Sequence, residues 1–384
     1  DITANVAAGY AGIGNQYAMG AAGASISTGD LKFNVTSVDG GAILGTHSVV
    51  NITTKNDNAT LTPNYGDGNS SWGVGQYGLL AGSTVISGET LDTGEYSTIT
   101  TMDLKLNQTT TGGFITPILN NGIRAIQGAT SNTTTLPNGG RGTAGQVIVN
   151  GVLDMTLTGN RSVGIYVSGN ATNHGVATDR APVFNALTPK VILNNDATII
   201  INKGTGFSST TWDSHGIKLG KVRYAGEGPG ILESHGNLVI DTTNALQGGG
   251  IKMMRNSILD ASDSNASTTI KTNGYALEIG GHDDAAKNGV VLTYEQAASH
   301  GLTASFNNAV FTTNGTSIDP LITATGARKD LIFVDQGQSG AKLNFTGANT
   351  NLTANTNGHI LNVSGNYTAS YYAYYSNTYD SLGT

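Results

Sequence analysis

The tetrapeptide Gly216-Ile217-Lys218-Leu219 is one copy of a pattern that the chain repeats on both sides of it. In each copy two apolar residues flank one residue that is basic, aromatic or acidic. Successive side chains of a strand point to opposite faces, so this alternation predicts a β-strand with one buried face. The other copies are Gly122-Ile123-Arg124-Ala125, Gly164-Ile165-Tyr166-Val167, Gly250-Ile251-Lys252-Met253 and Ala276-Leu277-Glu278-Ile279.

Two further apolar pieces accompany each of the later copies. Ile148 to Met155, Ile192 to Ile199 and Ile231 to Leu238 are each seven residues apart, which supports the alignment of these pieces. Three short strands per pass, at a period of roughly 25–45 residues, predict one turn of a parallel β-solenoid, which needs copies above and below to bury its apolar face. The first pieces are Val147-Ile148-Val149-Asn150, Val191-Ile192-Leu193-Asn194, Gly230-Ile231-Leu232-Glu233 and Ser257-Ile258-Leu259-Asp260, and the second are Leu153/Met155/Leu157, Ile199/Ile201, Leu238/Ile240 and Thr268/Ile270.

The composition agrees with an all-β solenoid with loop insertions. Of 384 residues, 54 are Gly and 7 are Pro, and 12% are charged, about half the usual quarter. We expect one elongated body in three parts: a cap or irregular first turns at 1–30, the β-helix at 31–365, and a Tyr-rich end turn or linker at 366–384. A polar loop at 127–145 and a short helix over Ala285 to Ser299 are the expected insertions.

The chain has no cysteine, which favours a bacterial exported protein that crosses a disulfide-forming compartment unfolded. The sequence contains no apolar run of about 18 residues, so it predicts no transmembrane helix. The start at Asp1-Ile2-Thr3-Ala4 has no basic-then-apolar signal, so we expect any signal peptide to have been removed. A net charge of −7 argues against a nucleic-acid partner.

The repeated Gly-Ile-x-Val/Leu/Met and Val-Ile-Leu-Asn pieces, in a Cys-free chain rich in Asn, Thr and Gly, resemble the passenger domains of bacterial autotransporters. Among these the chain is most similar to the AIDA-type adhesins, over most of 31–365. The resemblance implies a right-handed, three-stranded parallel β-helix that is exported across the outer membrane. It also implies a C-terminal β-barrel translocator, which would follow this passenger.

Stacked turns should align the middle residues of the repeated tetrapeptide into one outward stripe, because parallel strands lie about 4.8 Å apart. A basic stripe with a tyrosine suits an extended polyanion, since cations meet sulfate or carboxylate groups and the ring packs on a sugar face. A solvated face that keeps the stack soluble is the alternative. The candidate glycan-binding residues are Arg124, Tyr166, Lys218, Lys221, Arg223, Lys252 and Arg255.

A second, acidic and amide-rich stripe is expected at the outward ends of the first pieces. It would contact a protein partner or a second copy of the chain, and the alternative is an internal ladder of hydrogen-bonded Asn side chains. The candidate protein-binding residues are Asn150, Asn194, Asn195, Asp196, Glu233, Asp241, Asp260 and Asp263.

Enzymatic patterns are incomplete in this sequence. Glycan-cleaving solenoids need clustered carboxylates, and the best candidate, Gly281-His282-Asp283-Asp284, lacks an accompanying Arg-x-Lys. Ser214-His215-Gly216 and Ser234-His235-Gly236 are interpreted as turns flanking core strands, and Ser299-His300-Gly301 repeats the same three residues. His-Glu-x-x-His and the calcium-binding Gly-Gly-x-Gly-x-Asp repeat do not occur, so we expect no metal or other cofactor.

The sequence therefore predicts a bacterial surface adhesin, attached or released, that is not an enzyme and is not itself embedded in a membrane. Its expected ligands are host matrix glycans of the glycosaminoglycan type, matrix protein, or both. The main alternative is self-association that causes bacterial aggregation and biofilm, and a polysaccharide-cleaving enzyme is a remote one.

Overall fold

The computed structural model describes backbone and side chains at 96, 98–109, 120–126, 144–169, 188–204, 214–220, 229–245, 248–254, 257–279, 302–315, 330–334, 341–356 and 358–363. It describes the backbone alone for strands β1 to β8 and for Ser97, Thr110 and Leu119. In these parts every regular element is a β-strand. The predicted helix over Ala285 to Ser299 and the segment 366–384 lie outside them.

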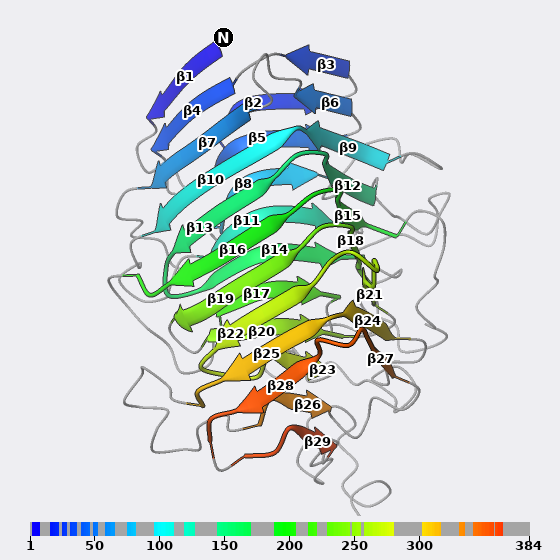
Figure 1. The fold of residues 1–384 in the computed structure, drawn as a ribbon. Helices are drawn as coiled ribbons and strands as arrows, with labels where there is room; N and C mark the ends of the chain where they lie inside the picture. The colour runs from blue at the N-terminus through cyan, green and yellow to red at the C-terminus, as the bar shows by residue number, and fades with distance from the viewer. Residues whose placement is uncertain are drawn as a thin grey trace, which may run out of the picture.

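The chain winds through three parallel sheets in turn, here named A, B and C, and Figure 1 shows the strands of each sheet stacked down the molecule. Each strand pairs with the strand three elements later, so every pass adds one strand to each sheet. The predicted three-stranded parallel β-helix is confirmed.

Sheet A has ten strands: β1 (Ile2–Ala7), β4 (Leu31–Thr36), β7 (Asn58–Tyr65), β10 (Asp103–Thr110), β13 (Leu153–Thr158), β16 (Ala197–Asn202), β19 (Leu238–Asn244), β22 (Thr268–Thr272), β25 (Ala309–Thr313) and β28 (Asn351–Ala354). Sheet B also has ten: β2 (Gln16–Ala22), β5 (Gly40–Thr46), β8 (Gly75–Ala81), β11 (Leu119–Ile126), β14 (Ser162–Ser168), β17 (Ser214–Leu219), β20 (Gly248–Met253), β23 (Leu277–Ile279), β26 (Ile332–Val334) and β29 (Leu361–Val363). Sheet C has nine: β3 (Ser25–Thr28), β6 (Val49–Ile52), β9 (Tyr96–Thr101), β12 (Ala144–Val149), β15 (Lys190–Leu193), β18 (Ile231–Ser234), β21 (Ile258–Ala261), β24 (Thr303–Asn307) and β27 (Lys342–Thr346).

The first three strands fall within residues 1–30 and pair in parallel with β4, β5 and β6. The backbone of this segment therefore continues the three sheets.

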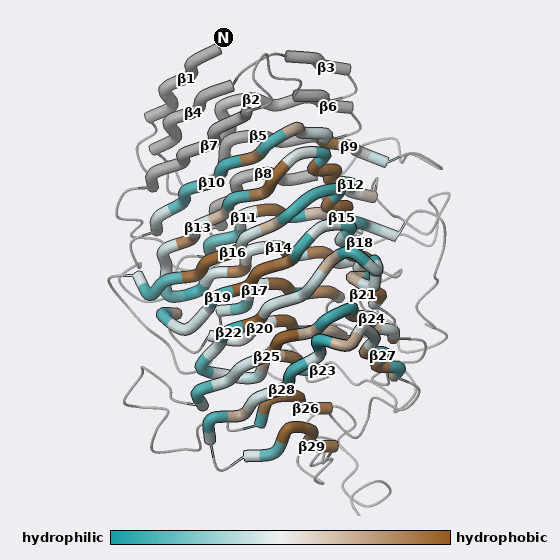
Figure 2. Tube along the Cα trace, in the orientation of Figure 1, coloured by the Kyte–Doolittle hydropathy of each residue, from teal (hydrophilic) through white to brown (hydrophobic). Residues whose placement is uncertain are grey.

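The core is a column of apolar side chains that repeats from turn to turn. On sheet B, Ile123, Ile165, Ile217 and Ile251 are neighbours in register, and all four are fully buried. Figure 2 shows the matching alternation of brown and teal along the strands. Burial of apolar area stabilises the stack by roughly 25 cal/mol per Å². No single turn can enclose this column, and the requirement explains the repetition.

Candidate functional site

The outer face of sheet B carries the row that the repeated tetrapeptide predicts. Arg124 pairs with Tyr166, Tyr166 with Lys218, Lys218 with Lys252, and Lys252 with Glu278. We call these five residues the sheet-B row. The alignment of the tetrapeptides is therefore correct, and residues up to 154 positions apart in sequence lie in one row on the outer face of the sheet.

A glycine precedes the core isoleucine in four of the five copies because the turns approach each other closely there. A Cβ atom on Gly164 would lie 2.5 Å from the carbonyl oxygen of Gly216 and 2.5 Å from Cγ2 of Ile199. Neither contact is possible without moving backbone or core, so this position is restricted to glycine. The close approach holds consecutive members of the sheet-B row one strand spacing apart.

Tyr166 lies between two cations. The guanidinium carbon of Arg124 is 5.3 Å from the centroid of the Tyr166 ring, and the ammonium of Lys218 is 5.6 Å from it. Both distances are within the range of an attractive cation–π contact. The ring is 7% exposed, whereas Arg124 and Lys218 are partly exposed.

The second half of the row is different from the open basic stripe that the sequence suggests. Lys252 and Glu278 are each only 7% exposed, and the Lys252 ammonium is 3.0 Å from Oε1 of Glu278. A buried cation requires a nearby anion. Lys252 lies on the outer face of sheet B as expected, but it is not an exposed cation, because the next turn supplies the acid that neutralises it.

A histidine joins this ion pair from an earlier turn. Nε2 of His215 is 3.6 Å from Oε2 of Glu278, and its side chain is 4% exposed. Gly249 lies between them in the stack, and a Cβ atom there would approach Cδ2 of His215 to 2.9 Å. The missing side chain leaves room for the imidazole. The interpretation of Ser214-His215-Gly216 as a turn is wrong, because all three residues belong to strand β17.

Three other candidate glycan-binding residues, Lys221, Arg223 and Arg255, lie outside the described residues. The same is true of His282, Asp283 and Asp284, and of the third Ser-His-Gly sequence at 299–301.

The second predicted stripe does not form a continuous line. The first pieces are in register through Val147, Val191, Leu232 and Leu259, so Ile192 pairs with Glu233 and not with Ile231. The seven-residue spacing aligns Ile192 with Ile231, which is wrong by two residues, because the partner of Ile192 is Glu233. A shift of two residues keeps a side chain on the same face of the sheet but places it in a different row, and the eight candidates are therefore divided among several places.

Four of these candidates lie at turns and satisfy hydrogen bonds there. The Asn194 amide donates to Oδ1 of Asn150 over 2.8 Å. Oδ1 of Asn195 accepts from the backbone N–H of Asp196 over 2.8 Å. Oδ1 of Asp196 accepts from the backbone N–H of Asn237 over 2.8 Å. All four side chains are exposed, and only the Asn150–Asn194 contact joins two amides on successive turns, so these residues do not form an internal ladder.

Of the remaining four candidates, three lie on sheets A and C and Asp263 lies in a turn. Glu233 and Asp260 are neighbours on the outer face of sheet C, and Asp241 lies on the outer face of sheet A. Oδ2 of Asp263 is 3.1 Å from Nδ1 of His235, in a turn as predicted for this histidine. Only Glu233 and Asp260 remain adjacent acids on an accessible face.

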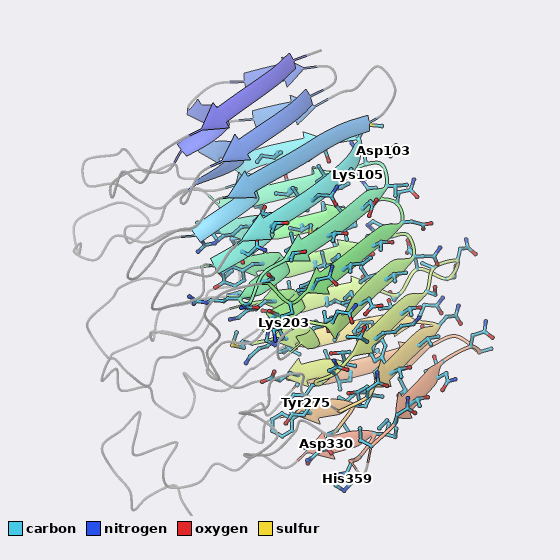
Figure 3. The ribbon with its side chains drawn as sticks, turned by 90° about the vertical axis from the view of Figure 1, so that its left-hand side faces the viewer. Asp103, Lys105, Lys203, Tyr275, Asp330 and His359 are labelled. Carbon is cyan, nitrogen blue, oxygen red and sulfur yellow. The ribbon has the colours of Figure 1, made fainter. Side chains whose placement is uncertain are left out.

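The C-terminal end of sheet B holds a polar network that the sequence did not predict. Oδ1 of Asp330 accepts from the backbone N–H of His359 over 2.7 Å and lies 3.0 Å from Nδ1 of the same residue. Oδ2 of Asp330 accepts from the Asn362 amide over 2.9 Å. Beside this network the rings of Tyr275 and Phe333 stack with centroids 5.1 Å apart, and Figure 3 shows Tyr275, Asp330 and His359 close together at the lower end of the coil.

Burial alone would raise the pKa of Asp330. The hydrogen bonds from Asn362 and His359, with the charge of His359, outweigh it and hold the pKa below its ordinary value of 3.8. No local sequence pattern predicts this network, because Asp330 is 29 and 32 residues away from its partners His359 and Asn362.

Within the described ranges, no three His, Asp or Glu side chains are grouped to hold a metal ion. The same ranges contain no helix of the length and apolarity needed to cross a membrane. No protein-family model matches the chain, and the searches of curated proteins and of solved structures find no significant match.

Proposed function

We propose that this protein is a rod-like bacterial surface adhesin that binds an extended polyanionic glycan and catalyses no reaction. The observation that carries the proposal is the Arg124–Tyr166–Lys218 group, in which two partly exposed cations flank one aromatic ring on three consecutive turns. Sulfate and carboxylate groups form charge-assisted hydrogen bonds with such cations.

The geometry supports a polymer that runs along the coil. Arg124 and Lys218 are two strand spacings apart, which is about 9.6 Å. That separation suits negative groups on alternate sugar units of an extended chain. Lys252 has no part in the proposed contact, since Glu278 already neutralises it. The cell-surface location and the bacterial autotransporter class belong to the same proposal, and they are supported by the Cys-free, Asn- and Gly-rich repeats.

The test is binding to heparin and chondroitin sulfate by Arg124→Ala/Lys218→Ala. The matched control is Lys105→Ala/Lys271→Ala, which removes the same charge from exposed positions on sheet A. Each lost charged hydrogen bond contributes about 1.5–3 kcal/mol, so the first variant should bind at least about tenfold more weakly and show a shallower dependence on salt. Equal affinities of the two variants would refute this site.

A neutral dextran should bind neither the wild type nor the two variants. Release of reducing or unsaturated sugar ends from the polyanion would instead support the enzyme alternative.

A further inference from the structure

Four isoleucines form a continuous line on the outer face of sheet C, whose strands follow one another down the right-hand side of Figure 1. Ile148 is in register with Ile192 on the next turn, and Ile231 is in register with Ile258. We call these four residues the isoleucine ridge. All four are partly exposed. A contiguous apolar group on a polar face is a feature of interaction surfaces.

The ridge runs obliquely across the strands because it changes row between β15 and β18. Ile192 is in register with Glu233, and Ile231 is in register with Lys190. The ridge therefore passes between Lys190 on one side and Glu233 on the other, and Asp260 extends the acidic side by one turn.

The cation on the first side is held in place. The ammonium of Lys190 lies 5.3 Å above the ring of Tyr96, whose hydroxyl donates to the carbonyl oxygen of Thr188 over 3.0 Å. Of the acids on the second side, Glu233 has His235 as a neighbour at 4.0 Å, a distance typical of a weak exposed contact. Both charges remain available to an approaching surface.

This arrangement is its own complement. In a two-fold dimer each residue of the interface meets the symmetry-related surface of the other copy. Suppose that the two-fold axis lies in the contact plane and runs along the ridge. Each isoleucine then packs against the ridge of the second copy. Lys190 of each copy faces Glu233 of the other, so the interface contains two equivalent Lys190–Glu233 pairs. From this complementarity we propose that the outer face of sheet C is a homodimer interface.

The oblique course of the ridge fixes the geometry of the dimer. A two-fold rotation about an oblique line makes the two coils cross, so their ends do not join and no filament grows. Arg124 and Lys218, the partly exposed cations of the sheet-B row, lie on a different sheet from this interface. The inference is therefore independent of the proposed glycan binding, and crossed dimers would link passengers that extend in different directions.

The experiment is analytical ultracentrifugation of the full chain and of two charge reversals, Lys190→Glu and Glu233→Lys. The wild type should dimerise as its concentration rises. Each single variant should lose the dimer, because like charges then meet across the axis. An equimolar mixture of the two variants should recover it. In the mixed dimer the introduced carboxylate at position 190 faces the introduced ammonium at position 233, and the unchanged Glu233 of the first variant faces the unchanged Lys190 of the second.

Lys271→Glu on sheet A is the control for a change of charge alone, and it should dimerise like the wild type. Ile192→Asn should weaken the dimer at least tenfold without changing the far-UV circular dichroism. A wild type that stays monomeric at millimolar concentration overturns the proposal. Single variants that still dimerise, or a mixture that stays monomeric, overturn it as well. Heparin binding by the charge variants, measured in parallel, reports separately on the sheet-B row.

Discussion

The buried ion pair between Lys252 and Glu278 gives the sharpest energetic prediction. At 3.0 Å, with an effective dielectric constant of about 20, the attraction between the two charges is about 5–6 kcal/mol. Removing both charges from water costs several kcal/mol per ion, so an apolar pair of similar volume should be about as stable. Removing one partner takes the nearest counter-charge away from a buried charge, which costs about 3–5 kcal/mol.

We therefore expect Lys252→Met and Glu278→Leu each to destabilise the protein by about 3–5 kcal/mol. The free energy of unfolding of the double variant should lie within about 2 kcal/mol of that of the wild type. The effects of the two substitutions would then be strongly coupled. The assay is urea unfolding followed by far-UV circular dichroism, with a check that the slope against urea is the same for all four proteins. Lys271→Met, on the exposed face of sheet A, is the control and should change stability by less than about 0.5 kcal/mol.

Additive effects of the two single substitutions would refute this account of the pair. Small effects of both, comparable with that of Lys271→Met, would show that the two charges are not buried together.

Two further predictions concern the close packing of the turns and the C-terminal network. Gly216→Ala should cost about 1–3 kcal/mol, because the new methyl would lie 3.0 Å from the carbonyl oxygen of Gly250 and against Cγ2 of Ile240; an unchanged urea midpoint would contradict it. Asp330→Asn should lower the thermal midpoint at neutral pH and have little effect in strong acid. The folded-state pKa of Asp330 is below 3.8, so its contribution is present above that pH and is lost as the pH falls through the folded value. A difference between the two proteins that persists unchanged below about pH 2 would contradict this explanation.

The sequence predicts the rows of sheet B well because each copy carries its own marker. A glycine and a following β-branched or leucine core residue fix both the corner and the face of β11, β14, β17 and β20. The register of Arg124, Tyr166, Lys218, Lys252 and Glu278 follows directly.

Sheet C is harder to predict because its strands lack such a marker. Ile231 and Leu232 are both apolar, and the seven-residue spacing aligns Ile231 with Ile192, whereas the structure pairs Leu232 with Val191 and buries Leu232. Ser234 then occupies the core position that Val149 and Leu193 hold in earlier turns, with 1% exposure. A small polar residue in a core position breaks the apolar alternation, and this explains the shift of two residues.

The sequence also could not predict which polar side chains of different turns are in contact. The distance along the chain from His215 to Glu278, or from Asp330 to His359, depends on insertions whose lengths vary from turn to turn. A pattern that reads one strand at a time cannot predict which polar side chains on the outer face meet. The burial of Lys252 and the separation of the acidic candidates have this common origin.

The central claim is that the chain adds one strand spacing per turn, and spin labels measure this directly. The chain contains no cysteine, so pairs of introduced cysteines can be labelled cleanly. Asn107, Ile200 and Thr353 lie in one row on the outer face of sheet A, and register pairs connect them through Thr156, Asp241, Lys271 and Thr312.

With one label at Thr353→Cys, a second at Ile200→Cys is four turns away and one at Asn107→Cys is six turns away. Pulsed electron–electron double resonance should give distances of about 19 Å and about 29 Å, in proportion to the number of turns. Distances that do not increase in the ratio of four to six, or broad distributions for both pairs, would contradict the stacked coil and every row derived from it.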